Sequence, residues 1–166
     1  LVSALKEFPN FNASLNPESN KVIYKKYFHI GFAVDTPHGL MGPKLRDVDQ
    51  MSIQKIGEEL KNISQLCREL KIDKKEFFGG SMTISSLGGI GGTHFTPIIN
   101  PPEVAILGVG KTFDRLVKEK NQIVSKKILP ISLSYDHRLI DGAEGARFCV
   151  YLGKCLGKDF AFKLAV

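Results

Sequence analysis

Apolar residues recur every three or four positions between Gln50 and Leu70, which is the clearest periodic segment of the chain. They are Ile53, Ile56, Leu60, Ile63, Leu66 and Leu70. This spacing places them on one face of an amphipathic helix, and such a face usually packs on a sheet. Asp49 precedes the segment and is a residue type that caps helices. The pattern predicts a helix over Gln50–Leu70 with Asp49 at its N-cap.

Two further segments read as helices. The first, Leu1–Phe8, is short and is stopped by Pro9. The second runs from about Asp141 to Leu156. We expect this last helix to bury Ala143, Ala146, Val150 and Cys149.

The remaining apolar runs alternate or are too short for helices, and they predict strands. These strands are Lys21–Tyr27, Phe28–Val34, Leu40–Val48, Met82–Ser86, Glu103–Gly110 and a segment from Gln122–Val124 through Ile128–Tyr135. A turn falls at 37–39, and a charged loop at 71–80. Mixed strands with two long helices on one side indicate an α/β sandwich rather than a doubly wound Rossmann fold.

Composition indicates one ordinary globular domain. The chain has 166 residues, 43% hydrophobic and 24% charged, so it can bury a sizeable core and requires no second domain. Its net charge is +6, but the 23 basic residues are spread along the chain without interleaved aromatics. This favours a solvated basic surface, with a minor attraction for an anionic substrate, over a nucleic-acid site.

Cysteine usage and hydropathy bear on the cellular compartment and on the solubility of the protein. Cys67, Cys149 and Cys155 are odd in number and lack a CxxC spacing, which argues against a disulfide framework or a zinc site and favours a reducing compartment. No apolar run reaches the ~20 residues that cross a bilayer, and the N-terminus shows no signal peptide, so we expect a soluble protein. The chain starts at Leu1 in what reads as the end of a helix, and we expect it to be a fragment.

Two glycine-containing segments suggest nucleotide binding but lack its motifs. Gly108–Thr112 ends like a P-loop, yet the first glycine of that motif would fall at Ala105, within a predicted strand. Gly88–Gly92 lacks the GxGxxG spacing, and no periodic helix follows to offer its dipole to a pyrophosphate. A chain crossing is the favoured interpretation.

The strongest candidate for chemistry is His137. The strand ending at Tyr135 runs into His137-x-x-x-Asp141-Gly142, which then opens the last helix. A histidine at a strand end is held by the sheet while its ring can face a ligand, and imidazole moves protons near neutral pH. An isolated motif of this kind could equally be a buried histidine tied to a carboxylate.

The other histidines carry weaker signals. His29 lies in a predicted strand, His38 in a turn and His94 after the glycines, and no HExxH or His-x-x-x-His spacing supports a metal. We interpret all three as structural or surface residues. His94 could still line a substrate channel, because it lies nine positions beyond Ser85.

The residues around His137 resemble a known family. Asp136–Gly142 is similar to the DHRxxDG signature of the dihydrolipoyl acyltransferases, the core subunits of 2-oxo-acid dehydrogenase complexes. Three other segments match that family in order and spacing, so that nearly the whole chain is covered: Phe28–Pro37, Gly80–Gly88 and Pro97–Gly108. The run from Gly91 to Val109 looks most like the acetyl-transferring members of pyruvate complexes, although branched-chain enzymes share parts of it.

The resemblance implies a mechanism and its residues. His137 would act as the general base on the thiol of coenzyme A, and the thiolate would attack the thioester of S-acetyl-dihydrolipoamide. Ser85, the first serine of the TIS segment, would stabilise the oxyanion, while Ser86 stands where relatives often carry Asn. Asp141 would orient the site or tie the turn in place, with the structural role favoured. Asp136 and Arg138 would be framework charges, paired within or between subunits.

The resemblance also implies an architecture. It predicts a chloramphenicol-acetyltransferase-like two-layer sandwich with a mixed sheet, assembled as homotrimers in which Ser85 of one chain faces His137 of its neighbour. Such trimers build larger cubic or dodecahedral cores. The chain would be the C-terminal portion, residues 1–166, of a catalytic domain that is longer at its N-terminus, with the lipoyl and peripheral-subunit-binding domains and part of the coenzyme A channel outside it.

The implied substrates are coenzyme A and the lipoyl group, with no metal, and the implied partners are a thiamine-dependent 2-oxo-acid decarboxylase, dihydrolipoyl dehydrogenase and a lipoyl domain. No nucleic acid or membrane partner is expected. The implied location is the bacterial cytoplasm, with the mitochondrial matrix as the alternative. Three other functions stay open: the core of a branched-chain or 2-oxoglutarate complex, a free-standing acyltransferase with another acceptor, and an inert scaffold.

One departure from the family pattern is visible. Gly39–Lys44 stands where relatives usually show two valines, the proline and another apolar residue. Gly42 weakens strand propensity, and Lys44 places a charge at a normally apolar position. We expect altered packing there.

Overall fold

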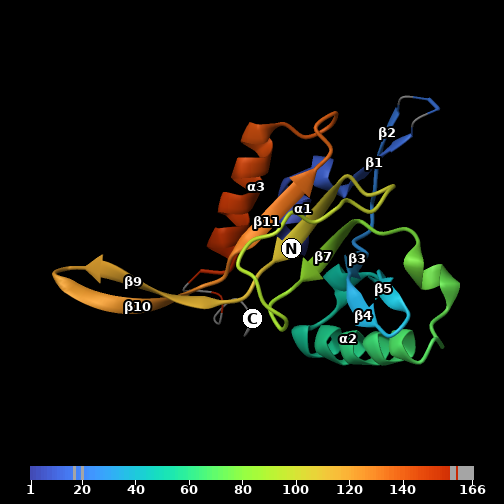
Figure 1. Cartoon of the computed structure of the whole chain (residues 1–166). Coiled ribbons are helices and arrows are strands. Elements are labelled where there is room, and N and C mark those ends of the chain that lie inside the picture. The colour runs from blue at the N-terminus through green and yellow to red at the C-terminus, as the bar shows by residue number, and fades with distance from the viewer. Residues whose placement is uncertain (17, 20, 158–159, 161–166) are drawn as a thin grey trace.

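The computed structural model describes residues 1–16, 18–19, 21–157 and 160. A five-stranded mixed sheet forms its centre, in the order β11-β8-β7-β3-β6 (Figure 1). These strands are β3 (Ile30–Phe32), β6 (Lys44–Leu45), β7 (Met82–Ser86), β8 (Ala105–Val109) and β11 (Ile131–Tyr135). The central strands β3, β7 and β8 are parallel, and the outer strands β6 and β11 pair with them antiparallel.

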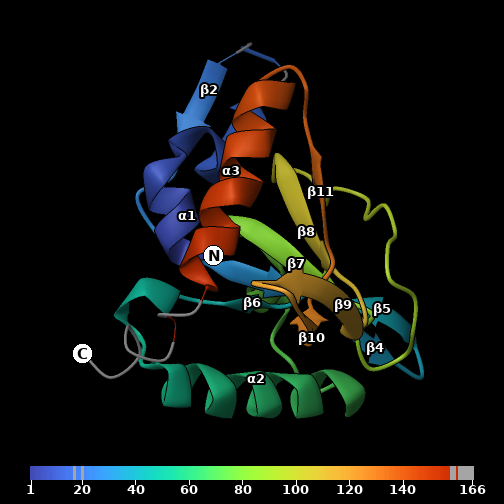
Figure 2. The same cartoon turned by 90° about the vertical axis from the view of Figure 1, so that its left-hand side faces the viewer.

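Helices cover one face of this sheet. They are α1 (Val2–Glu7), α2 (Ile53–Arg68) and α3 (Gly142–Cys155), and Figure 2 shows α1 beside α3, with α2 across the end of the sheet. Ile30, Met82 and Leu107 point to this face and join the main core with Phe11 and Phe148. The rings of Phe11 and Phe148 stack with centroids 4.1 Å apart, which ties the first segment of the chain to α3.

None of the described helices α1, α2 and α3 covers the opposite face of the sheet. Side chains on a strand alternate between faces, so Thr83, Ser85 and their register partners Ile106 and Gly108 lie on this side. The segment between β7 and β8 covers it, and a Cβ added at Gly108 would come 3.0 Å from the ring of Phe95. Glycine at 108 therefore allows this close approach, and the sheet with its helices on one face confirms the predicted α/β sandwich.

Three two-stranded hairpins complete the described part of the fold. They are β1 (Ala13–Asn16) with β2 (Lys21–Tyr24), β4 (Val34–Thr36) with β5 (Gly39–Met41), and β9 (Phe113–Glu119) with β10 (Gln122–Ile128). The β9–β10 hairpin projects from the body as an arm (Figure 1). Its turn residues Lys120 and Asn121 both have positive φ, the geometry of a two-residue hairpin turn. Short 3-10 helices lie at Pro9–Asn12, Val48–Gln50 and Lys74–Phe77.

The two long helices differ in detail from the sequence-based expectation. Helix α2 begins at Ile53 with Ser52 as its N-cap, whose hydroxyl accepts from the Lys55 N–H at 3.2 Å. The prediction of Asp49 as the N-cap of this helix was wrong, because Asp49 lies in a separate 3-10 helix. The predicted apolar stripe is only partly buried: Ile53 is exposed, and Leu70 is exposed beyond the end of α2 at Arg68.

The buried face predicted for α3 was also wrong. Ala143, Ala146 and Val150 are exposed and Cys149 is only partly buried, whereas Gly145, Phe148 and Leu152 are buried. Phe148 is the largest apolar side chain of the helix, and its stacking on Phe11 decides which side faces the core. Gly145 lies under Tyr135, where a Cβ would come 2.9 Å from the ring.

The strand predictions were confirmed unevenly. Met82–Ser86 was predicted with its observed bounds. Leu40–Val48 is two short strands rather than one, and the segment predicted from Gln122 to Tyr135 is β10 and β11, separated at Pro130. Strand β9 was not predicted.

Other features bear on the expected setting of the protein. No helix of the described part of the chain is long and apolar enough to span a membrane. All three cysteines are free, and burial raises the pKa of the Cys67 and Cys149 thiols.

Candidate active site

The turn after β11 presents His137 at the surface. Backbone hydrogen bonds hold this turn: the Asp136 N–H donates to the Val104 carbonyl at 2.8 Å, and the N–H groups of Leu139 and Ile140 both donate to the Asp136 carbonyl at 3.0 Å. The imidazole of His137 is exposed and tilted against the ring of Tyr135, 5.8 Å away. No described residue hydrogen-bonds to this ring, so both of its nitrogens are open to a ligand or a second chain.

Asp136 and Arg138 pair within the chain. The guanidinium of Arg138 donates to the Asp136 carboxylate through Nε at 2.9 Å and through an Nη at 2.6 Å. These hydrogen bonds lower the pKa of Asp136 below its ordinary value. The pair stiffens the turn on both sides of His137, which agrees with its expected role as a framework.

Asp141 begins helix α3. Its carboxylate accepts from the Glu144 N–H at 2.7 Å, which is the N-cap geometry. Among the described residues it makes no hydrogen bond to His137. The structure thus gives Asp141 a structural task, and a direct task in catalysis stays a prediction.

Ser85 lies on the other face of the sheet, in a cavity. It sits near the end of β7, partly buried, and lines a cavity of ≈ 640 Å³. Apolar side chains including Met41, Ile98 and Ile106 form much of the wall, and Lys44 and Glu103 are its charged members. A cavity with apolar walls and few polar groups suits a flexible organic substrate arm.

A single chain does not bring Ser85 and His137 together. Ser85 is in register with Gly108 on β8, which is in register with Ser132 on β11. His137 is five residues beyond Ser132 along the direction of β11. Two strand spacings, the rest of β11 and the first residues of the turn after it put the two side chains on the order of 20 Å apart. A site that uses both residues has to combine two chains.

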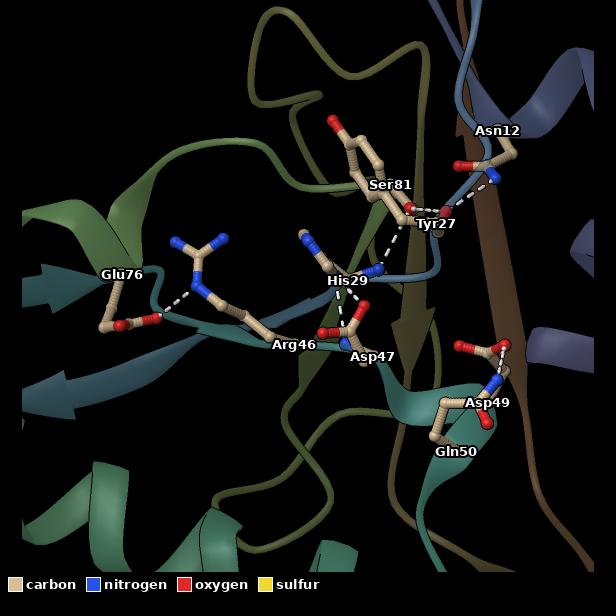
Figure 3. A network of polar contacts seen from close by, with 9 residues as sticks. All are labelled: Asn12, Tyr27, His29, Arg46, Asp47, Asp49, Gln50, Glu76 and Ser81. Carbon is tan, nitrogen blue, oxygen red and sulfur yellow. Dashed lines mark hydrogen bonds and ion pairs between the residues drawn. The ribbon is translucent and has the colours of Figure 1, made fainter.

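His29 belongs to a structural network (Figure 3). Its ring stacks on Tyr27 with centroids 4.2 Å apart, and its Nδ1 accepts from the Asp47 N–H at 3.0 Å. Its backbone N–H donates to the Ser81 hydroxyl, which donates in turn to the Tyr27 carbonyl. Burial lowers the pKa of His29, with Asp47 acting in the opposite direction. These contacts confirm the structural interpretation of this histidine.

The remaining histidines lie outside the cavity. His38 is exposed in the β4–β5 turn, and exposed His94 lines a separate depression with Phe95, Ser132 and Ser134. The structure therefore does not place His94 in the cavity of Ser85. Within the described ranges, no three His, Cys, Asp or Glu side chains gather as metal ligands.

A buried polar cluster beside Ser85 was missed from the sequence. Lys44, Thr83 and Glu103 meet on the cavity side of the sheet and are all buried. The sequence analysis predicted altered packing at Lys44 because of its charge, but it did not predict the ion pair with Glu103. The available signal was a second charge, Glu103, at the start of the apolar run Val104–Val109.

The fold defines a class of proteins. The structure is similar to chloramphenicol acetyltransferase, with a TM-score of 0.59 at 15% sequence identity, over 93% of this chain and 73% of that one. The likeness shows that the chain has the fold of this acetyltransferase, as the sequence predicted. Residues 1–161 match the family model described as 2-oxoacid dehydrogenases acyltransferase (catalytic domain), and the chain belongs to that family.

Individual relatives agree with this assignment. The chain is 51% identical over 159 residues to the dihydrolipoyllysine-residue acetyltransferase component of the pyruvate dehydrogenase complex from Cupriavidus necator, and 49% identical over 156 residues to that of Haemophilus influenzae. These alignments cover 96% and 94% of this chain, but 28% of each relative. The chain therefore spans about a quarter of the length of these relatives.

Solved structures extend the likeness to three dimensions. Dihydrolipoamide acetyltransferase from Azotobacter vinelandii, studied for the role of a serine, a histidine and an asparagine in its mechanism, matches with a TM-score of 0.92 at 48% identity. A structure of the cubic core of the pyruvate dehydrogenase multienzyme complex matches with a TM-score of 0.92 at 47% identity. Each comparison covers 99% of this chain and 68% of the other.

Proposed function

We propose that the chain is the catalytic part of an enzyme that transfers an acetyl group between S-acetyl-dihydrolipoamide and coenzyme A, in the core of a pyruvate dehydrogenase complex. The observation that carries this proposal is a spacing. In the Azotobacter enzyme the serine and histidine under study are 52 positions apart, and the asparagine follows the histidine by four. Ser85, His137 and Asp141 repeat both separations. The third residue differs, because Asp141 stands where that enzyme has asparagine.

The proposed chemistry needs a base and a donor to an oxyanion. A free thiol has a pKa of about 8.5, so little thiolate exists at neutral pH. Neutral His137 takes the proton of the coenzyme A thiol as its sulfur attacks the thioester carbonyl. The Ser85 hydroxyl donates a hydrogen bond to the oxygen as it becomes negative. The tetrahedral species then collapses, the carbon–sulfur bond to dihydrolipoamide breaks, and the leaving thiolate takes the proton from His137.

The same proposal requires an assembly. Because Ser85 and His137 of one chain are on the order of 20 Å apart, the working site combines Ser85 of one protomer with His137 of the next, as in a homotrimer. Exposed apolar side chains suit such contacts: Leu40 and Ile98 flank the cavity, and Leu116 and Ile123 lie on one face of the β9–β10 arm. The solved relative forms a cubic core, and we propose a cubic core here, with a dodecahedral one as the alternative.

The wider complex follows from the family. The proposed partners are a 2-oxo-acid decarboxylase, dihydrolipoyl dehydrogenase and a lipoyl domain that delivers the acetyl group. The proposed location is the bacterial cytoplasm, with the mitochondrial matrix as the alternative. Branched-chain and 2-oxoglutarate complexes use related cores, so acetyl specificity rests on the roughly 50% identity to pyruvate-complex relatives.

The test is acetyl transfer from acetyl-CoA to dihydrolipoamide by the complete protein. We expect His137→Ala to lower kcat by about 10²–10⁴-fold and Ser85→Ala by about 10²–10³-fold. His38→Ala, a substitution at an exposed histidine in a turn, serves as the matched control and should leave the rate unchanged. An inactive wild type would support the scaffold alternative. A preference for succinyl or branched acyl groups would move the protein to another complex.

A further inference from the structure

Three polar side chains form a closed ring of hydrogen bonds beside Ser85. The Lys44 ammonium donates to Glu103 Oε1 at 2.5 Å and to Thr83 Oγ1 at 3.0 Å. The Thr83 hydroxyl donates to Glu103 Oε2 at 2.6 Å. Both carboxylate oxygens of Glu103 thus have a donor, and the positive and negative charges neutralise one another.

The ring is almost wholly removed from water. The side chains of Lys44 and Glu103 are each 1% exposed. Buried charges are costly unless they are paired and hydrogen-bonded, and a buried ion pair often gives little net stability compared with apolar residues of similar volume. The presence of this pair therefore calls for an explanation other than stability alone.

The surrounding backbone leaves room for this ring. A Cβ added at Gly31 would come 2.6 Å from Lys44 Nζ, and closer to the Thr83 hydroxyl. A Cβ at Gly80 would come 2.7 Å from Lys44 Cε, and closer to a Glu103 carboxylate oxygen. Glycine at both positions lets the ring close against the backbone.

The ring joins the parts that hold Ser85. Lys44 comes from β6, Thr83 from β7 and Glu103 from the segment before β8. Thr83 is two residues before Ser85, so both side chains point to the same face of the same strand and line the same cavity. The ring therefore links β7 to β6 and to the segment before β8, at a position two residues before Ser85.

We propose that Lys44, through Thr83 and Glu103, is a positioning residue for Ser85 and holds its hydroxyl where the oxyanion forms. This inference rests on the proposed function. Hydrogen-bond donors act on a developing charge only when their geometry is fixed in advance, and misplacement by about 1 Å can cost about 10²-fold in rate.

The experiment measures kcat and KM of the complete, assembled protein for acetyl transfer from acetyl-CoA to dihydrolipoamide. Two variants open the ring. Lys44→Met with Glu103→Gln removes both charges together and leaves an amide oxygen that can accept from Thr83, so that no unpaired charge is buried. Thr83→Val keeps the ion pair and a β-branched strand residue, and removes only the link to β7. We expect each to lower kcat by about tenfold to 10²-fold with little change in KM.

Each variant is then combined with Ser85→Ala. If the ring acts through Ser85, opening it in the Ser85→Ala protein should change kcat by less than about twofold, because the effects of substitutions at interacting residues are not additive. The matched control is Lys55→Met with Glu59→Gln, which removes a Lys–Glu pair between an exposed lysine and a half-buried glutamate on α2 and should leave kcat and KM unchanged. Thermal unfolding and sedimentation establish that each variant is folded and assembled.

The outcomes separate the two proposals. A wild type without acetyl transfer overturns the proposed function, and this inference with it. If the wild type is active and a folded ring variant keeps the wild-type kcat, the inference is overturned and the proposed function stands. The same holds if opening the ring slows the Ser85→Ala protein by as much as it slows the wild type.

Discussion

Asp141 lies four positions beyond His137, and its structural contact can be tested apart from the proposed chemistry. The carboxylate of Asp141 caps helix α3 through the Glu144 N–H. Asp141→Ala should therefore lower the free energy of unfolding by about 1 kcal/mol, whereas Asp141→Asn keeps a capping side chain and should change it by less than about 0.5 kcal/mol. Denaturation curves of the complete protein measure both. A large loss of kcat in a stable Asp141→Asn protein would instead assign the carboxylate a direct part in the chemistry.

We expect Lys25 to make the free energy of unfolding depend on pH. Its ammonium donates to the carbonyls of Gly80 and Ala13, and burial lowers its pKa from 10.5 to about 8, although Glu103 acts in the opposite direction. Because the folded pKa lies below the unfolded one, the unfolded chain binds more protons between these two values, and stability rises with pH across that window.

Comparison of the wild type with Lys25→Met tests this dependence. The stability of the wild type relative to the variant should increase from about pH 8 to pH 10.5 and level off on either side. Lys26→Met, at the exposed neighbouring lysine, is the control for replacing a lysine by methionine. A constant difference between wild type and Lys25→Met over this range would contradict the assignment.

The β9–β10 arm is the element best suited to hold neighbouring protomers. Leu116 and Ile123 lie on one of its faces and are 72% and 74% exposed. If a second chain covers them, Leu116→Ser with Ile123→Ser removes about 1.5–3 kcal/mol of apolar burial per residue, which weakens association by about tenfold or more at each. Analytical ultracentrifugation should show smaller assemblies of folded protein. Ile53→Ser, at the exposed start of α2, is the control, and an unchanged assembly would exclude the arm from the interface.

The same arm shows what the sequence could not predict. Strand β9 has charged residues within it and is mostly exposed, so it lacks the alternation that burial of one face imposes. Its pairing is set by the positive-φ turn at Lys120 and Asn121, which lacks the Asn-Gly signal. Strand β7, in contrast, was predicted with its observed bounds because its apolar residues and hydroxyls lie between Gly80 and Gly88.

The residues of the candidate site also differ in how far the sequence alone predicts them. His137 could be found from local sequence, because a strand, a turn and a helix start enclose it. Ser85 was predicted only through the family resemblance, since a serine in a strand carries no signal of its own. The ring of Lys44, Thr83 and Glu103 joins three distant segments, and such a contact depends on tertiary packing.

The whole molecule explains why the proposed chemistry needs more than one chain. The sheet that supports both residues also separates them, with Ser85 in the cavity on one face and His137 in an exposed turn beyond the edge strand β11. Neither the cavity nor the turn is a complete site by itself. In the proposed homotrimer, a head-to-tail interface repeated around a threefold axis would supply each cavity with the histidine of a neighbour.

Mixed assemblies of two inactive variants test this claim most directly. Ser85→Ala and His137→Ala chains of the complete protein are assembled separately and as an equal mixture, and acetyl transfer is measured for each. With sites shared between neighbouring chains, about one interface in four of the mixture combines an intact serine with an intact histidine. We expect the mixture to recover about a quarter of the wild-type activity, whereas a mixture no more active than the separate variants would contradict a shared site.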